Sequence, residues 1–258
     1  MKNCLAAVLV LIAALPSWAF RPDQVRLGVL RYGDASDFDP YPTVWREVAR
    51  ALEEATSVEF DPLVKEPVRP TAQELQSHAL VFLLATPAFK GWSPSERAAL
   101  ANWVKLGGGT IVVLGAEGLG AAAARGSRGA DSDGLDARIR REMELIFEGA
   151  KLEAISPKHA LFKSFYLVRG TGGVLERSRV VEGIRIGERY GLIFSRNDLL
   201  GALLKDAEGR YLFGCYPGGE EQRKESFKLV VNIFLYALTG TYKEDIIHLP
   251  YILQKLKR

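Results

Sequence analysis

The amino-acid sequence predicts an α/β protein built on a doubly wound, mostly parallel sheet. Two apolar runs, ALVFLLAT at 79–86 and TIVVLGA at 110–116, lack polar alternation, which is typical of strands covered on both faces. A segment with helix start and stop signals lies between them. Strands and helices therefore alternate with short connections, the pattern that right-handed crossovers in a parallel sheet produce.

The remaining segments of the first half supply helices and outer strands. Ser93 and Glu96 have the spacing of a capping box, which begins a helix that runs through Lys105 and stops at Gly107. Prolines after a short strand at 58–60 predict that this strand does not continue. The predicted elements up to residue 116 are a strand at 25–32, an acidic loop, a helix at 43–55, a strand at 58–60, a helix at 72–77, a strand at 79–86, a helix at 93–105 and a strand at 110–116.

The second half predicts a helix, a β-hairpin and a long closing helix whose apolar face packs on the sheet. These elements are a helix at 135–147, strands at 183–186 and 190–195 with a turn near Gly187, and a helix at 220–238 that ends at Gly240. Because neither an internal repeat nor a linker divides the chain, residues 20–258 are expected to form a single domain.

Residues 1–19 are interpreted as a secretory signal peptide. Lys2 supplies a positive start, residues 5–15 are apolar, and small residues precede the expected cleavage after Ala19. The apolar run is about half of the ~20 residues that span a bilayer, so an uncleaved anchor is the less favoured alternative. We therefore expect an exported protein, periplasmic or extracellular, that is not an integral membrane protein after cleavage.

Charge and cysteine content narrow the classes of partner. The formal net charge of +3 falls when Lys2 is removed, and such a balanced chain is not expected to bind nucleic acid. Cys215 is the one cysteine outside the predicted signal, so the mature chain has no intramolecular disulfide. The basic end YILQKLKR is read as a solvated helix end, with contact to a membrane surface or partner as the alternative.

Small residues follow the predicted third strand, at 110–116, and this loop has three interpretations. Gly118, Gly120 and Ala123 match a dinucleotide-binding spacing, but no strand with an acidic end follows them, so no cofactor is expected. A nucleophile elbow needs a Ser or Cys, and residues 115–118 contain neither. A tight structural turn is the favoured interpretation.

Other candidate residues follow from the rule that ligands bind at the carboxyl ends of strands in open α/β sheets. Asp34, Asp37 and Asp39 lie within six residues, but they lack the glycine and distal Glu of a calcium loop, so a solvated turn is favoured. The three histidines lack metal-ligand spacing, and no metal site is expected. The catalytic candidates are Asp34, Glu117, His159 and Asp198, and the ligand-binding candidates are Thr86, Ala116 and Asn197. Three aromatic residues can offer a face to a sugar: Phe89, Trp92 and Tyr216.

Several motifs in a fixed order resemble the bacterial domain-of-unknown-function family 4159 (DUF4159). The most specific are KHALFKSFY at 158–166 and SRNDL at 195–199, and the resemblance covers nearly the whole mature chain. It implies a three-layer flavodoxin-like fold with a β-hairpin addition, similar to class I glutamine amidotransferases and ThuA-like proteins. Family members often carry a Cys after the third strand. Here Ala116 and Glu117 stand there, which removes the amidotransferase nucleophile and weakens any claim of hydrolase activity by analogy.

The function expected from these observations is a non-catalytic α/β domain that binds a partner or a small polar ligand in the cell envelope. The resemblance implies a neighbourhood of envelope-associated ATPase and von Willebrand-type proteins, so an envelope protein is the expected partner. The alternative is a hydrolase or carbohydrate-processing enzyme that uses Asp34, Glu117, His159 and Asp198 at the carboxyl edge of the sheet.

Overall fold

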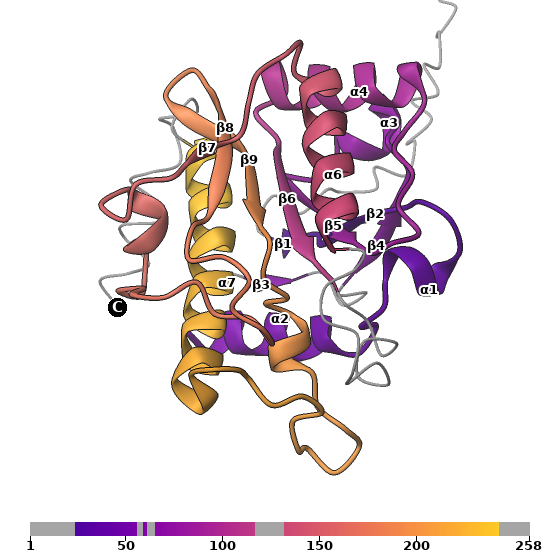
Figure 1. Ribbon diagram of the computed structural model, residues 1–258. Coiled ribbons are helices and arrows are strands. Elements are labelled where there is room, and N and C mark those ends of the chain that lie inside the picture. The colour runs from indigo at the N-terminus through magenta and orange to yellow at the C-terminus, as the bar shows by residue number, and fades with distance from the viewer. Residues whose placement is uncertain (1–23, 56–58, 61–64, 117–131, 243–258) are drawn as a thin grey trace, which may run out of the picture.

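The structure is a computed structural model that describes residues 24–55, 59–60, 65–116 and 132–242. Its main sheet has seven strands in the order β4-β2-β5-β6-β9-β8-β7 (Figure 1). The strands are β4 (Glu66–Val68), β2 (Gly28–Leu30), β5 (Leu80–Ala85), β6 (Thr110–Gly115), β9 (Arg189–Ser195), β8 (Glu182–Ile186) and β7 (Glu153–Ala154). The first five pair in parallel, and β8 and β7 add antiparallel strands at one side. The predicted α/β class, the mostly parallel sheet and the β8–β9 hairpin are confirmed.

The parallel strands follow the order 2-1-3-4-5 when they are numbered along the chain, which is the flavodoxin-like order. A separate parallel pair joins β1 (Gln24–Val25) to β3 (Glu59–Phe60). The helices are α1 (Ala35–Phe38), α2 (Val44–Ala55), α3 (Ala72–Leu75), α4 (Pro94–Lys105), α6 (Ser132–Ile146) and α7 (Gly219–Tyr242), with short 3₁₀ turns η1 (Ala160–Phe162) and η2 (Gly201–Leu203).

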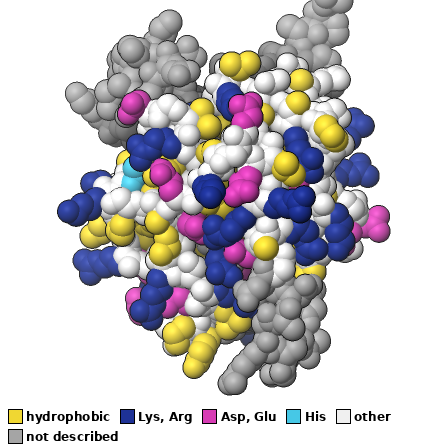
Figure 2. All heavy atoms as spheres, turned by 45° about the horizontal axis from the view of Figure 1, so that its top comes forward, with side chains coloured by type: hydrophobic (Ala, Val, Ile, Leu, Met, Phe, Trp, Pro, Cys, Tyr) yellow, Lys and Arg dark blue, Asp and Glu magenta, His cyan; other side chains and the backbone are white. Residues whose placement is uncertain are grey.

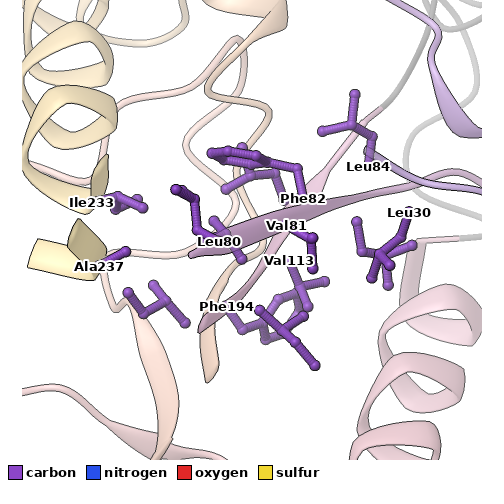
Figure 3. Close-up of a cluster of buried hydrophobic side chains, with 14 of the residues drawn as sticks. Leu30, Leu80, Val81, Phe82, Leu84, Val113, Phe194, Ile233 and Ala237 are labelled. Atoms are coloured by element: carbon purple, nitrogen blue, oxygen red, sulfur yellow. The ribbon is translucent and has the colours of Figure 1, made fainter. Parts of the chain in front are cut away.

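Helices cover both faces of the sheet, so the fold has three layers. Phe82 of β5 packs between Trp45 of α2 and Phe234 of α7, with ring centroids 5.1 and 5.2 Å apart. The register aligns Phe82 with Ile193 through β6, so the next residue, Phe194, points to the opposite face. There the guanidinium of Arg140 in α6 lies over the Phe194 ring. Figure 3 shows this division, with α7 on the Phe82 side.

The unbroken apolar strands are the centre of the core, as their sequence predicts. All six residues of β5 are buried, and so are the first five of β6. Ser93 begins α4 through the predicted capping box with Glu96, while Pro94 takes the first helical position, where its missing N–H costs nothing. Local signals therefore determine where this helix begins, and burial determines which strands are central.

One strand was not predicted. The prolines were expected to stop the strand at 58–60, but a separate strand, β4, contains Pro67 and forms the edge of the main sheet. The N–H of Glu66 donates to the Leu27 carbonyl and the Val68 carbonyl accepts the N–H of Arg31, at the two ends of β2, so the nitrogen of Pro67 faces away from the sheet. The strand at 110–115 is consequently the fourth of the parallel set, and β5, which ends before Thr86, is the third.

Helix boundaries also differ from prediction. The acidic loop after β2 contains one helical turn, α1, and α7 continues past Gly240 to Tyr242. No described helix combines the length and apolarity needed to cross a bilayer. On the face shown in Figure 2, basic and acidic side chains are interspersed, with hydrophobic side chains scattered between them.

Candidate functional site

The carboxyl ends of the parallel strands meet along the lower edge of the sheet in Figure 1. The order of the strands reverses between β2 and β5, and open α/β sheets bind ligands in the crevice at such a point. Most of the predicted site residues follow strands that end here: Asp34 follows β2, Thr86 follows β5, Ala116 follows β6, and Asn197 and Asp198 follow β9. Glu117, Gly118, Gly120 and Ala123 lie outside the described residues, as do the predicted signal peptide and the basic C-terminal end.

At the strand-reversal point, Tyr32 and Thr86 join β2 to β5. The phenolic oxygen of Tyr32 accepts the backbone N–H of Thr86 at 3.1 Å and lies 2.5 Å from the Leu84 carbonyl. The Thr86 hydroxyl donates to the carbonyl of Asp37 at 3.2 Å and accepts the N–H of Ala88. Burial raises the pKa of Tyr32, which keeps its hydroxyl protonated. Both side chains are therefore engaged in holding α1 against β5.

The three carboxylates after β2 point to different partners. Asp34 is exposed before α1, and its backbone N–H donates to the Asp37 carboxylate at 2.9 Å. Asp39 accepts the indole N–H of Trp45 at 3.0 Å and pairs with Lys65. Among the described residues, no group of three or more potential metal ligands comes together. The aspartates thus cap and anchor the chain between β2 and α2.

Asn197 is the centre of a buried polar network after β9. Its side chain is almost fully buried, and its amide nitrogen lies 3.0 Å from the Thr171 hydroxyl, 2.9 Å from the Gly172 carbonyl and 2.8 Å from the Ser178 carbonyl. Its amide oxygen accepts the N–H of Ser178 at 2.9 Å. One side chain thereby ties the loop at 171–178 to the end of β9 through its amide N–H groups and one lone pair of its amide oxygen.

The same loop is held from its other side by α7. The Glu225 carboxylate accepts the successive N–H groups of Arg169 and Gly170 at 2.6 and 3.0 Å, and the Ser226 hydroxyl accepts the N–H of Gly173 at 2.6 Å. Neither Glu225 nor Ser226 was predicted from the sequence to have this role. The glycine-rich run RGTGG at 169–173 is the signal that can reveal such a loop, because its backbone amides need partners that side chains elsewhere supply.

Asp198 is also buried. Its carboxylate accepts the hydroxyl of Tyr41 and, at 2.8 Å, the N–H of Gly201, which begins η2. Cys215 lies nearby with 8 % of its surface exposed. Burial raises the pKa of the Cys215 thiol, so the thiol stays protonated and is a weak nucleophile at neutral pH.

His159 lies far from these residues. It caps η1, where its Nδ1 accepts the N–H of Leu161 at 3.2 Å, and its ring packs edge-on against Tyr190 and Tyr236. Tyr190 stands near the start of β9, five residues before the strand's last residue, which at ~3.3 Å per residue is about 16 Å along the strand. Burial, with nearby positive charge, lowers the pKa of His159. The structure therefore does not bring His159 to Asp34 or Asp198.

The remaining predicted residues divide between buried and exposed. The backbone N–H of Ala116 donates to the Ala85 carbonyl, which extends the β5–β6 pairing by one residue. Phe89 and Trp92 are buried and contact each other, so they offer no face to a sugar. Tyr216 is 71 % exposed. Two shallow grooves, between α4 and α6 and beside β4 and α3, include none of the predicted site residues.

Comparison with known proteins adds a family. A family model described as "Domain of unknown function (DUF4159)" matches residues 26–238, which include every strand of the main sheet. This match agrees with the resemblance carried by the sequence motifs. None of the curated proteins searched matches the chain.

Proposed function

The chain belongs to the DUF4159 family of domains of unknown function, and from its own residues we propose that it is an exported, non-catalytic binding domain of the cell envelope. Its binding region is the carboxyl edge of the sheet, where the loops after β2, β5 and β9 meet. The alternative is a hydrolase that uses the same edge.

The observation that carries the proposal is the commitment of polar side chains at this edge. The Thr86 hydroxyl, the Asn197 amide and the Asp198 carboxylate each form hydrogen bonds with neighbouring loops. A nucleophile or general base has to keep a lone pair or proton for the substrate. Side chains bonded in this way stabilise the loops and are less available to react with a substrate. Well-ordered loops on a rigid sheet are suited to binding.

Placement of the histidine supports the same conclusion. The hydrolase alternative needs a base close to Asp34 or Asp198, whereas His159 is held by Leu161 and two tyrosine rings at the amino-terminal end of β9. Export is supported by the signal-like residues 1–19, and the envelope partner follows from export and from the family resemblance.

Export is tested by expressing the full chain in a bacterial host, fractionating the cells and measuring the mass of the protein. We expect a chain that begins at Phe20 in the periplasm or the medium. An unprocessed chain in the cytosol would overturn the proposed location.

Binding is tested by passing solubilised cell envelope over the immobilised mature chain and two variants. Asp34→Lys alters the exposed carboxyl edge, and Leu106→Ser alters the opposite end of the sheet, where Leu106 is 83 % exposed. We expect a retained component that Asp34→Lys loses and Leu106→Ser keeps. Equal retention by all three proteins would exclude the carboxyl edge. A hydrolytic activity of the mature chain that His159→Ala or Asp34→Asn abolishes, with the fold intact, would establish the hydrolase instead.

A further inference from the structure

The loop between η2 and α7, at the lowest point of Figure 1, displays three large apolar side chains within six residues. Tyr211, Leu212 and Tyr216 are 44 %, 47 % and 71 % exposed, and we call these residues the aromatic lip. At about 200 Å² for a whole side chain of this size, the fractions leave roughly 300 Å² of apolar surface in water. Exposed patches of this size are commonly functional.

The backbone beneath the aromatic lip is held in place. The N–H of Leu212 donates to the Leu204 carbonyl at 2.9 Å, and the N–H of Tyr216 donates to the Val174 carbonyl at 2.8 Å. The side-chain amide of Gln222, in the first turns of α7, donates to the Tyr216 carbonyl at 3.0 Å. A ring on such a backbone loses little conformational entropy when a ligand stacks on it.

The buried Arg223 fixes the other aromatic ring. Its guanidinium lies 3.9 Å from the centroid of Tyr211 and donates to the carbonyls of Ala202 and Phe213. The ring of Tyr211 therefore lies against a cation that is itself bonded to η2 and to the middle of the loop. Residues in the first turns of α7 therefore contact both the backbone of Tyr216 and the ring of Tyr211.

Charges around the aromatic lip are paired within the protein. Arg210 pairs with Asp206 and Glu208, and Lys205 lies 3.5 Å from Glu47. Arg223 pairs with a carboxylate of its own helix. A charged ligand would have to break these pairs to gain partners, whereas a neutral ligand that uses an apolar face and hydroxyl groups would leave them intact.

We propose that the aromatic lip binds a neutral polysaccharide chain, with the apolar face of one sugar ring stacked on Tyr216. The proposal rests on the proposed binding role of the carboxyl edge and names its ligand class. A sugar ring offers C–H groups on one face and hydroxyls at its rim, which match a tyrosine face surrounded by polar groups. A stable protein interface buries about 800 Å² on each partner, more than twice what the aromatic lip offers.

The test is affinity electrophoresis of the mature chain in native gels that contain hydroxyethyl cellulose, xyloglucan or glycol chitin, with alginate as the charged comparison. We expect at least one neutral polymer to retard the protein, and Tyr216→Ala to weaken the retardation at least tenfold. Tyr216→Phe keeps the ring and should bind nearly as the parent does. Leu106→Ala, an exposed apolar residue at the other end of the sheet, is the matched control and should bind unchanged.

Two results overturn the proposal. If no neutral polymer retards the parent, or if Tyr216→Ala binds as the parent does, the aromatic lip is not a neutral glycan site. Retardation by alginate alone would indicate a charged ligand. If an envelope protein is retained through Tyr216 while no polymer binds, the glycan proposal fails and the binding role of the carboxyl edge stands. If Asp34→Lys and Tyr216→Ala both retain the envelope component and the polymer as the parent does, both proposals fail.

Discussion

Replacing Asn197 with alanine should lower the free energy of unfolding by about 3 kcal/mol. The substitution removes the amide that accepts the N–H of Ser178 and donates to the Gly172 carbonyl, so two polar groups of the loop lose their partner. A buried polar group without a partner costs roughly 1–3 kcal/mol, and access of water to half-buried Ser178 keeps its cost at the lower end. For a chain of this size the melting temperature should fall by about 6–12 °C.

A second substitution at the same position sharpens this test. Asn197→Asp keeps an acceptor for Ser178 but places a carboxylate oxygen against the carbonyls of Gly172 and Ser178, so at pH 7 it should destabilise at least as much as alanine. Urea unfolding measured by tryptophan fluorescence gives both values, with Asn102→Ala on the exposed face of α4 as the control, expected to lie within about 0.5 kcal/mol of the parent. The reasoning is refuted if Asn197→Ala unfolds like the control, or if Asn197→Asp is as stable as the parent at pH 7.

Three further outcomes follow from other contacts. Burial lowers the pKa of His78 below the 6.5 of an unfolded histidine. Its contribution to stability is therefore complete above pH ~6.5 and is lost as the pH falls from there through the lowered pKa of the folded state. His78→Gln should flatten the decline in melting temperature between about pH 7.5 and 5.5, and an unchanged slope would contradict this. Gly172 has φ +61°, and a Cβ there would lie 2.5 Å from the backbone of α7. Gly172→Ala should therefore lower the free energy of unfolding in urea by more than about 3 kcal/mol, whereas the control Gly187→Ala, at φ +60° in open space, should lower it by about 1 kcal/mol. Equal losses would contradict the steric argument. Pro67→Val restores an outward N–H on the edge strand β4 and should produce concentration-dependent larger species by light scattering, which a profile identical to that of the parent would exclude.

Much of the fold could be predicted because its signals are local. The apolar runs at 79–86 and 110–116 predict the central strands, since a strand buried on both faces needs apolar residues at every position. Ser93 and Glu96 determine where α4 begins through bonds within four residues. The edge strand β4 was missed because its signal is not local. Pro67 is tolerated because β4 lies at the edge of the sheet, where the nitrogen of Pro67 needs no hydrogen-bond partner, and the local sequence does not show that position.

The contacts of the candidate site residues could not be predicted from nearby sequence. Sequence placed Asn197 and Asp198 correctly after a strand, but their partners lie 19 to 157 residues away, in Ser178, Thr171 and Tyr41. Whether a polar side chain meets a ligand or a distant loop depends on the packing of those segments. Sequence alone determined the α/β class, the central strands and the absence of a thiol or hydroxyl at residues 115–118. Only the tertiary structure decided that these polar groups anchor loops and that His159 stands at the opposite end of β9, because contacts between distant segments form when the whole sheet is assembled.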